Sequence, residues 1–164
     1  MARFDRGRAL GRMRWGLLLA ALAFCAVSGG GYWWWQQQAR LVEGEALFRG
    51  EAALAGALAG QAQSLPSMAT RCSNCHETHQ PQPLADKASS PVSASTYASP
   101  LSATWLQQAR LRHGGPETRY DARSLCQLLR TGVDPAMIMV STVMPRYQAT
   151  DAQCAALWTY LTSR

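Results

Sequence analysis

The sequence lacks several patterns that would identify other classes of protein. Only one C-x-x-C pair occurs, at Cys72 and Cys75, and Cys126 and Cys154 lie 28 positions apart, so a four-cysteine zinc site has no second pair. No segment alternates between apolar and polar residues, no βαβ pattern surrounds Cys72, and no internal repeat is visible. The missing βαβ pattern argues against a thioredoxin-type dithiol. We therefore predict an all-α domain.

Basic residues are scarce where nucleic-acid binding would need them. The chain has 164 residues and a formal net charge of +6, and residues 1–14 hold five arginines and a single acid, Asp5. From residue 36 onward, eleven Lys or Arg oppose nine Asp or Glu. A nucleic-acid-binding domain presents a basic face. We therefore expect no nucleic-acid partner.

Charge is absent altogether from residues 15–35. A helix of this length spans a hydrocarbon core of about 30 Å, at about 1.5 Å per residue. Arginines on one side predict a cytoplasmic arm at 1–14, and the aromatic run from Tyr32 to Trp35 suits the far membrane interface. We therefore predict a single-pass anchor in a bacterial inner membrane, with residues 36–164 as a periplasmic domain.

A cleaved signal peptide is the alternative to this anchor. Its small-residue cleavage site would be Ala21-Leu22-Ala23. Cys25 follows the bulky Phe24, which argues against a lipoprotein cysteine and favours an apolar residue of the anchor. Both interpretations export the C-terminal part of the chain.

The stretch Cys72-Ser73-Asn74-Cys75-His76 matches the C-x-x-C-H signature of covalent c-type haem attachment. Each thiol adds across one haem vinyl group, and a two-residue spacing matches the distance between the two vinyls. The adjacent His76 is then placed to bind the iron as the proximal ligand. One such motif predicts one haem c.

Two helices are predicted near the C-terminus. The first spans Ala122–Thr131, with Asp121 as N-cap and Gly132 just after its end. The second begins after Thr150, whose pairing with Gln153 forms a capping box. The proline- and serine-rich residues 80–104 are predicted to form a loop rather than a linker between domains.

The sixth iron ligand has six candidates. Met68 and His79 are too close in sequence to the attachment site, and Met137 and Met139 read as core side chains. His113 is expected to be exposed in a polar loop. Met144 is favoured because Pro145 makes its backbone extended and rigid, just before the capped terminal helix.

The chain resembles the monohaem class I cytochrome c family, through the C-x-x-C-H motif, Met144-Pro145 and the stretch Arg130-Thr131-Gly132-Val133 that ends the helix before them. The resemblance covers about residues 42–164. It implies a small helical fold around haem c, with His76 and Met144 as axial ligands. It also implies a proline carbonyl that orients His76, for which Pro83-Leu84 is the best match. The 23-residue gap between Phe48 and Cys72 and the long serine-proline loop depart from the family pattern.

Cys126 and Cys154 remain after the haem thiols are assigned. In an oxidising compartment they are placed to form a disulfide between the two last helices; the alternative is two small buried apolar side chains. A disulfide requires Cα atoms within about 7 Å.

A haem with two protein ligands leaves no open site for a substrate, and therefore exchanges single electrons. We predict a membrane-tethered electron carrier, not an enzyme, whose partners are redox proteins such as a dehydrogenase donor and an oxidase acceptor. Two alternatives stay open: a haem subunit of a dehydrogenase or oxidase complex, and a sensor or enzyme in which Met144 dissociates. Trp105, Arg110 and Arg112 are candidates for the pocket wall or for hydrogen bonds to haem propionates; ordinary core and surface positions are the alternative.

Overall fold

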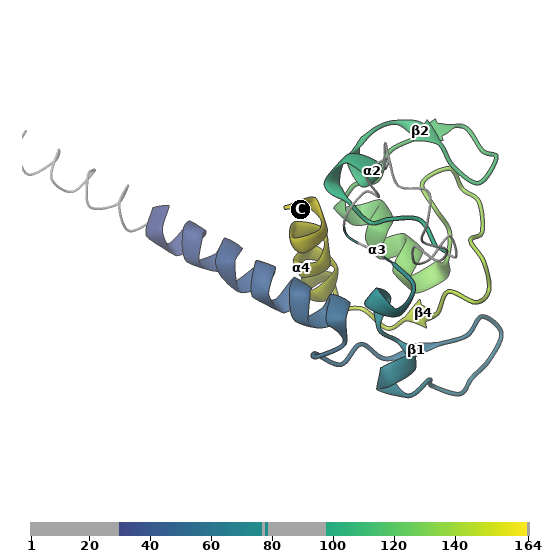
Figure 1. Ribbon diagram of the computed structural model, residues 1–164, viewed down its shortest axis with the longest axis horizontal. Coiled ribbons are helices and arrows are strands. Elements are labelled where there is room, and N and C mark those ends of the chain that lie inside the picture. Colours follow the sequence, from purple (N-terminus) through teal and green to yellow (C-terminus); the bar gives the residue numbers. More distant parts are fainter. Residues whose placement is uncertain (1–29, 77, 79–97, 164) are drawn as a thin grey trace, which may run out of the picture. The chain divides into compact units, whose positions relative to one another are not determined.

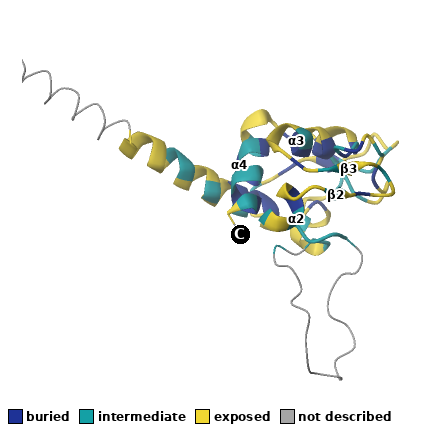
Figure 2. Cartoon of the chain, turned by 90° about the horizontal axis from the view of Figure 1, so that it is seen from above, coloured by how far each residue is buried: buried dark blue, intermediate teal, exposed yellow. Residues whose placement is uncertain are grey.

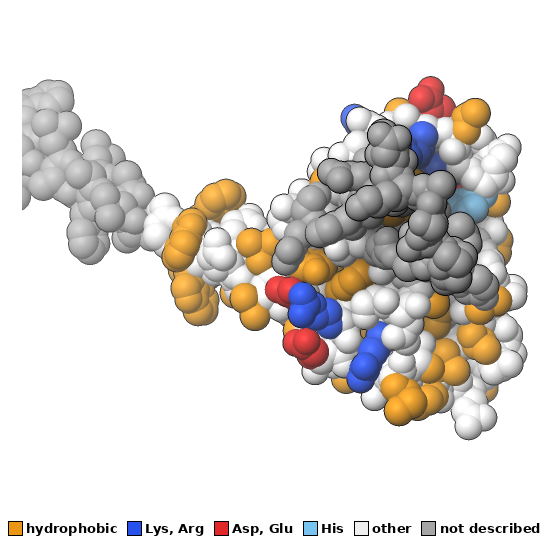
Figure 3. Space-filling view, in the orientation of Figure 1, with side chains coloured by type: hydrophobic (Ala, Val, Ile, Leu, Met, Phe, Trp, Pro, Cys, Tyr) orange, Lys and Arg blue, Asp and Glu red, His pale blue; other side chains and the backbone are white. Residues whose placement is uncertain are grey.

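The computed structural model describes residues 30–76, 78 and 98–163 (Figure 1). The chain divides into two compact units, Met1–Gln38 and Ala39–Arg164. In the first unit, residues 30–38 are helical. The aromatic run Tyr32 to Trp35 is 61–64% exposed, and hydrophobic side chains cover the visible side of this segment in Figure 3.

Most of the predicted membrane span, residues 15–29, lies outside the described residues, as does the basic arm 1–14. Within the described ranges, no helix combines the length and the apolar character needed to cross a membrane.

The second unit begins with helical residues 39–49. The elements that follow are β1 (Gly56–Ala57), the 3-10 helices η1 (Ser67–Ala69) and η2 (Cys72–Asn74), α2 (Ala103–Gln107), β2 (Arg110–Leu111), β3 (Glu117–Thr118), α3 (Ala122–Thr131), β4 (Arg146–Tyr147) and α4 (Asp151–Thr162).

The prediction of an all-α fold is wrong. Strand β1 pairs with β4 in an antiparallel sheet, with Gly56 opposite Tyr147, and β2 pairs with β3 in a hairpin. Each strand is only two residues long, so none shows the alternation by which a strand is recognised in a sequence. The pairing of β1 with β4 joins segments about ninety residues apart (Figure 1).

The two predicted C-terminal helices are confirmed, and their ends follow from local chemistry. The Asp121 side chain accepts a hydrogen bond from the Ser124 backbone N–H at the start of α3. Gly132 ends the helix with φ = 76°, a left-handed conformation that glycine adopts without steric cost. Thr150 and Gln153 form the predicted capping box of α4.

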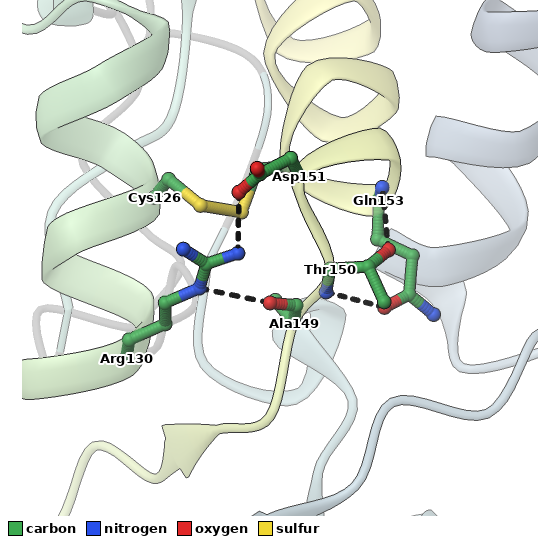
Figure 4. Close-up of polar contacts among 7 residues, drawn as sticks. Cys126, Arg130, Ala149, Thr150, Asp151 and Gln153 are labelled. Carbon is green, nitrogen blue, oxygen red and sulfur yellow. Dashed lines mark hydrogen bonds and ion pairs between the residues drawn. A yellow bond between two sulfur atoms is a disulfide. The ribbon is translucent and has the colours of Figure 1, made fainter.

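Helices α3 and α4 are joined by covalent and polar links (Figure 4). A disulfide connects Cys126 to Cys154, whose Cα atoms lie 5.3 Å apart, within the distance that the disulfide hypothesis requires. Arg130 on α3 donates to the Ala149 carbonyl at 2.8 Å and pairs with Asp151 at 2.7 Å. The start of α4 is therefore fixed against the second half of α3.

Helical residues 39–49 approach α4 closely at Gly44. A Cβ added there would lie 2.2 Å from the Ala156 carbonyl oxygen, so only glycine allows this approach. The ring centroids of Phe48 and Tyr160 lie 5.6 Å apart beside the crossing. The core extends from this crossing through the buried faces of α3 and α4 (Figure 2).

Candidate functional site

A cavity of about 520 Å³ lies inside the second unit. Its size falls within the range of small-molecule sites, roughly 300–1,000 Å³. Cys72, Cys75, His76 and Met144 all line it, although Met144 lies 68 positions after His76. Most of the remaining wall is apolar: Phe48, Leu106, Leu125, Leu128, Leu129, Val140, Leu157 and Leu161.

The C-x-x-C-H segment is held in a tight turn. The backbone N–H groups of Cys75 and His76 both donate to the Cys72 carbonyl, at 3.2 and 2.9 Å. The Asn74 side chain donates to the Met68 carbonyl at 2.8 Å and thereby anchors the turn to the preceding segment. This turn is why two thiols and one imidazole reach the same cavity.

His76 is oriented by a backbone carbonyl. Its Nδ1 lies 2.8 Å from the Ser99 carbonyl oxygen, so Nδ1 carries the proton and Nε2 keeps its lone pair for a ligand bond. Burial lowers the pKa of His76, and the hydrogen bond to Ser99 opposes this effect only in part. The imidazole is therefore neutral, as ligation requires.

The orienting carbonyl differs from the one that the family resemblance implies. Pro83-Leu84 lies outside the described residues. Ser99 accepts the bond from His76, and it precedes a second proline-leucine pair, Pro100-Leu101. The sequence contains this second pair, although Pro83-Leu84 is the pair that the family resemblance predicts.

Met144 is the half-buried methionine of the cavity wall. The other methionines proposed as ligands are exposed: Met68 by 67%, Met137 by 75% and Met139 by 60%. The interpretation of Met137 and Met139 as core side chains is therefore wrong. Met137 has φ = 62° in a tight turn, and this turn directs it outward even though its sequence neighbours are apolar. His79 lies outside the described residues.

His113 is not simply an exposed loop residue. It lines the cavity, and its Nδ1 lies 2.8 Å from the Asp134 carboxylate, while its side chain is 41% exposed. The Asp134 side chain is fully buried, and its other oxygen accepts a hydrogen bond from the Ile138 backbone N–H. The sequence indicated neither Asp134 nor this pairing, because the two residues lie in separate loops.

Arg112 supplies a buried positive charge beside the cavity. The side chain is 2% exposed and donates to the carbonyls of Trp105, Leu106, Gln108 and Thr118. Its guanidinium lies over the Trp105 ring at 4.2 Å and the Tyr120 ring at 4.7 Å, and both rings line the cavity. Burial raises the pKa of Tyr120 to about 12, so the phenol is uncharged.

Two guanidinium atoms in this region are buried without a hydrogen-bond partner, Nη1 of Arg112 and Nε of Arg110. A buried donor without a partner is costly. Neither arginine lines the cavity, but both guanidinium groups lie over the ring of Trp105, which does, so an anionic group such as a haem propionate bound near this ring would lie beside them. The residues present therefore fit a haem in three respects: attachment thiols, axial donors and a cationic edge.

Tyr147 stabilises the attachment side of the cavity. Its hydroxyl donates to the buried Thr70 carbonyl at 3.1 Å and also interacts with the Cys72 thiol. Burial raises the pKa of Cys72 to about 11. In the haem-free chain this thiol is therefore protonated at neutral pH.

Among the described residues, no cluster of three or more His, Cys, Asp or Glu side chains is placed to hold a metal ion. No protein-family model, curated protein or solved structure matches the chain. The resemblance to monohaem class I cytochromes c therefore stays a prediction, carried by this chain's own residues.

Proposed function

We propose that this protein is a monohaem c-type cytochrome that carries single electrons between redox proteins. One observation carries the proposal: a single cavity is lined by both thiols of the C-x-x-C-H motif, by its histidine and by Met144. Side chains this far apart in the sequence, and of these particular types, make up a complete set of attachment and axial groups for haem c.

Each residue has a distinct role in this proposal. Cys72 and Cys75 would hold the haem covalently through thioether bonds. His76 presents Nε2 because its Nδ1 proton is held by the Ser99 carbonyl. Met144 supplies a thioether sulfur, a ligand that raises the reduction potential relative to a second histidine. The apolar wall would exclude water, and the buried Arg112, which lies against the wall residues Trp105 and Tyr120, would offer charge for the propionates.

When bound, haem c supplies a reversible one-electron couple at its iron. Because His76 and Met144 would both bind the iron in this proposal, no open site would remain for a substrate. The protein then acts as a carrier rather than an enzyme. Its proposed partners are a dehydrogenase or other donor and an oxidase or other cytochrome acceptor.

The proposed location is the periplasmic side of a bacterial inner membrane. It rests on the uncharged residues 15–35, the arginines that precede them and the chemistry of haem attachment, which occurs after export. The exposed aromatic run at 32–35 suits a membrane interface. A membrane anchor would raise the effective concentration of the haem domain near its membrane partners.

Met144→Ala tests the axial assignment, with Met137→Ala as a matched control because Met137 is 75% exposed. In the oxidised protein, Met144→Ala is expected to lose the methionine–iron band at the red edge of the visible spectrum, and Met137→Ala to keep it. Carbon monoxide should leave the reduced wild type unchanged and bind the Met144→Ala variant. Rapid binding of carbon monoxide by the wild type would instead favour a sensor or enzyme.

A further inference from the structure

The segment that carries Met144 is an irregular loop, and few backbone hydrogen bonds support it. After the bridge between Val133 and Met139, the chain turns at Ser141, where the Met144 N–H donates to the Ser141 carbonyl at 3.1 Å. Regular pairing resumes at β4, where Arg146 lies opposite Ala57 of β1. The Val140 N–H also donates to the Gly132 carbonyl at 2.8 Å, and a side chain that contacts both ends of the segment from residue 140 to residue 144 would add to this support.

Arg146 makes these contacts. Its Nη1 donates to the Met144 carbonyl at 2.7 Å, at the near end of the loop. Its Nη2 lies 3.2 Å from the Val140 carbonyl and 3.5 Å from the Ser141 carbonyl, at the far end. One planar guanidinium thus connects both ends of the loop, which a single ammonium group cannot reproduce.

The surroundings of Arg146 indicate that this is its main role. Within the described ranges, no carboxylate forms an ion pair with it. Gly132 leaves the space for its guanidinium, because a Cβ added there would lie 2.0 Å from Arg146 Cζ. Gly132, directly after α3, therefore leaves room for the Arg146 guanidinium to lie against the loop.

We propose that Arg146 is the positioning residue for the sixth ligand: its guanidinium fixes the loop so that the Met144 sulfur stays on the iron. This inference rests on the proposed function. Groups that orient a metal ligand typically change its binding by about 10–100-fold when removed. Loss of the guanidinium should therefore make Met144 easier to displace, while the covalent haem and His76 stay in place.

Titration of the oxidised full-length protein with imidazole, which competes with methionine for the iron, tests this. Arg146→Lys and Arg146→Gln are expected to bind imidazole with a Kd at least about tenfold lower than the wild type. The control is Arg130→Lys, because Arg130 also donates to a backbone carbonyl and lies on α3, outside the cavity wall. Its Kd is expected to stay within about twofold of wild type, since it makes no contact with the loop.

Gly132→Ala gives a second route, because its Cβ would displace the guanidinium without altering Arg146 itself. Gly60→Ala, at a similar φ of 77° but in open space, controls for the strain that alanine meets in a left-handed conformation. Gly132→Ala is expected to lower the Kd in the same direction, and it keeps the test decisive if an Arg146 variant does not fold. Equal Kd values for the Arg146 and Arg130 variants, with Gly132→Ala unchanged, would overturn the role of Arg146. If the proposed function, and with it the assignment of Met144 as a ligand, is wrong, Met144→Ala would instead keep the methionine–iron band.

Discussion

The disulfide between Cys126 and Cys154 gives a prediction whose size follows from the loop that it closes. The two cysteines are 28 positions apart. A loop of this length removes chain entropy from the unfolded state worth about 3.6 kcal/mol at 25 °C. Both cysteines are buried members of the hydrophobic core, and the link joins α3 to α4. Reducing it is therefore expected to lower the free energy of unfolding by about 3–4 kcal/mol.

Chemical denaturation of the wild type, with and without a phosphine reductant, measures this difference. Ascorbate in both samples keeps the haem in one oxidation state, so that only the disulfide changes. The double variant Cys126→Ala/Cys154→Ala is the control, because its stability should not respond to the phosphine. A loss below about 1 kcal/mol in the wild type, or an equal loss in the double variant, would refute the reasoning.

Three further predictions concern local features of the fold. Asp121→Ala removes the N-cap of α3 and should cost about 1 kcal/mol at pH 7. Hydrogen bonds from Ser124 lower the pKa of Asp121, so the contribution of its carboxylate to stability is present at neutral pH and lost as pH falls below about 4. Equal stabilities of the wild type and Asp121→Ala at pH 7 would contradict this. Gly44→Ala should lower the free energy of unfolding by about 1–3 kcal/mol, measured by denaturation, because its Cβ meets the Ala156 carbonyl. Gly31→Ala, in open space, should cost nothing. Equal effects of the two substitutions would exclude the close crossing. Burial raises the pKa of Tyr120 from 10.0 to about 12, so between these pH values the folded state retains a proton that the unfolded state loses. The free energy of unfolding should therefore fall as pH rises from 10 to about 12. A Tyr120→Phe variant with the same decline would exclude this cause.

Features set by neighbouring residues could be predicted from the sequence. Helix α3 begins after Asp121 and ends at Gly132 because capping and left-handed φ depend on residues within one turn. The capping box of Thr150 and Gln153 is equally local. The C-x-x-C-H motif is a local signal as well, and its turn is made by bonds among its own residues.

Features set by contacts between distant segments could not be predicted. Strand β1 exists because Gly56 meets Tyr147 across the fold, and two residues carry no periodic signal. The Ser99 carbonyl accepts the bond from His76 although the two residues lie 23 positions apart, a contact that no local pattern in the sequence indicates. Met137 is 75% exposed in a turn with positive φ, although its apolar neighbours in the sequence suggested the core.

Arg146 shows the same limit within the candidate site. The Met144-Pro145 pair suggested a rigid loop, and the structure adds that the next residue, Arg146, donates to the Met144 and Val140 carbonyls. An arginine after a proline has no distinctive pattern. Its role becomes visible only when its guanidinium is seen to meet carbonyls on both sides of the loop.

The central claim is that Cys72 and Cys75 hold one haem covalently. It is tested most directly by the mass of the denatured full-length protein after treatment with an alkylating reagent, from cells that attach haem to exported proteins. The account predicts the chain mass plus one haem, no alkylation at either cysteine, and a haem-bearing peptide that contains residues 72–76. A chain without haem in which both cysteines are alkylated would contradict it.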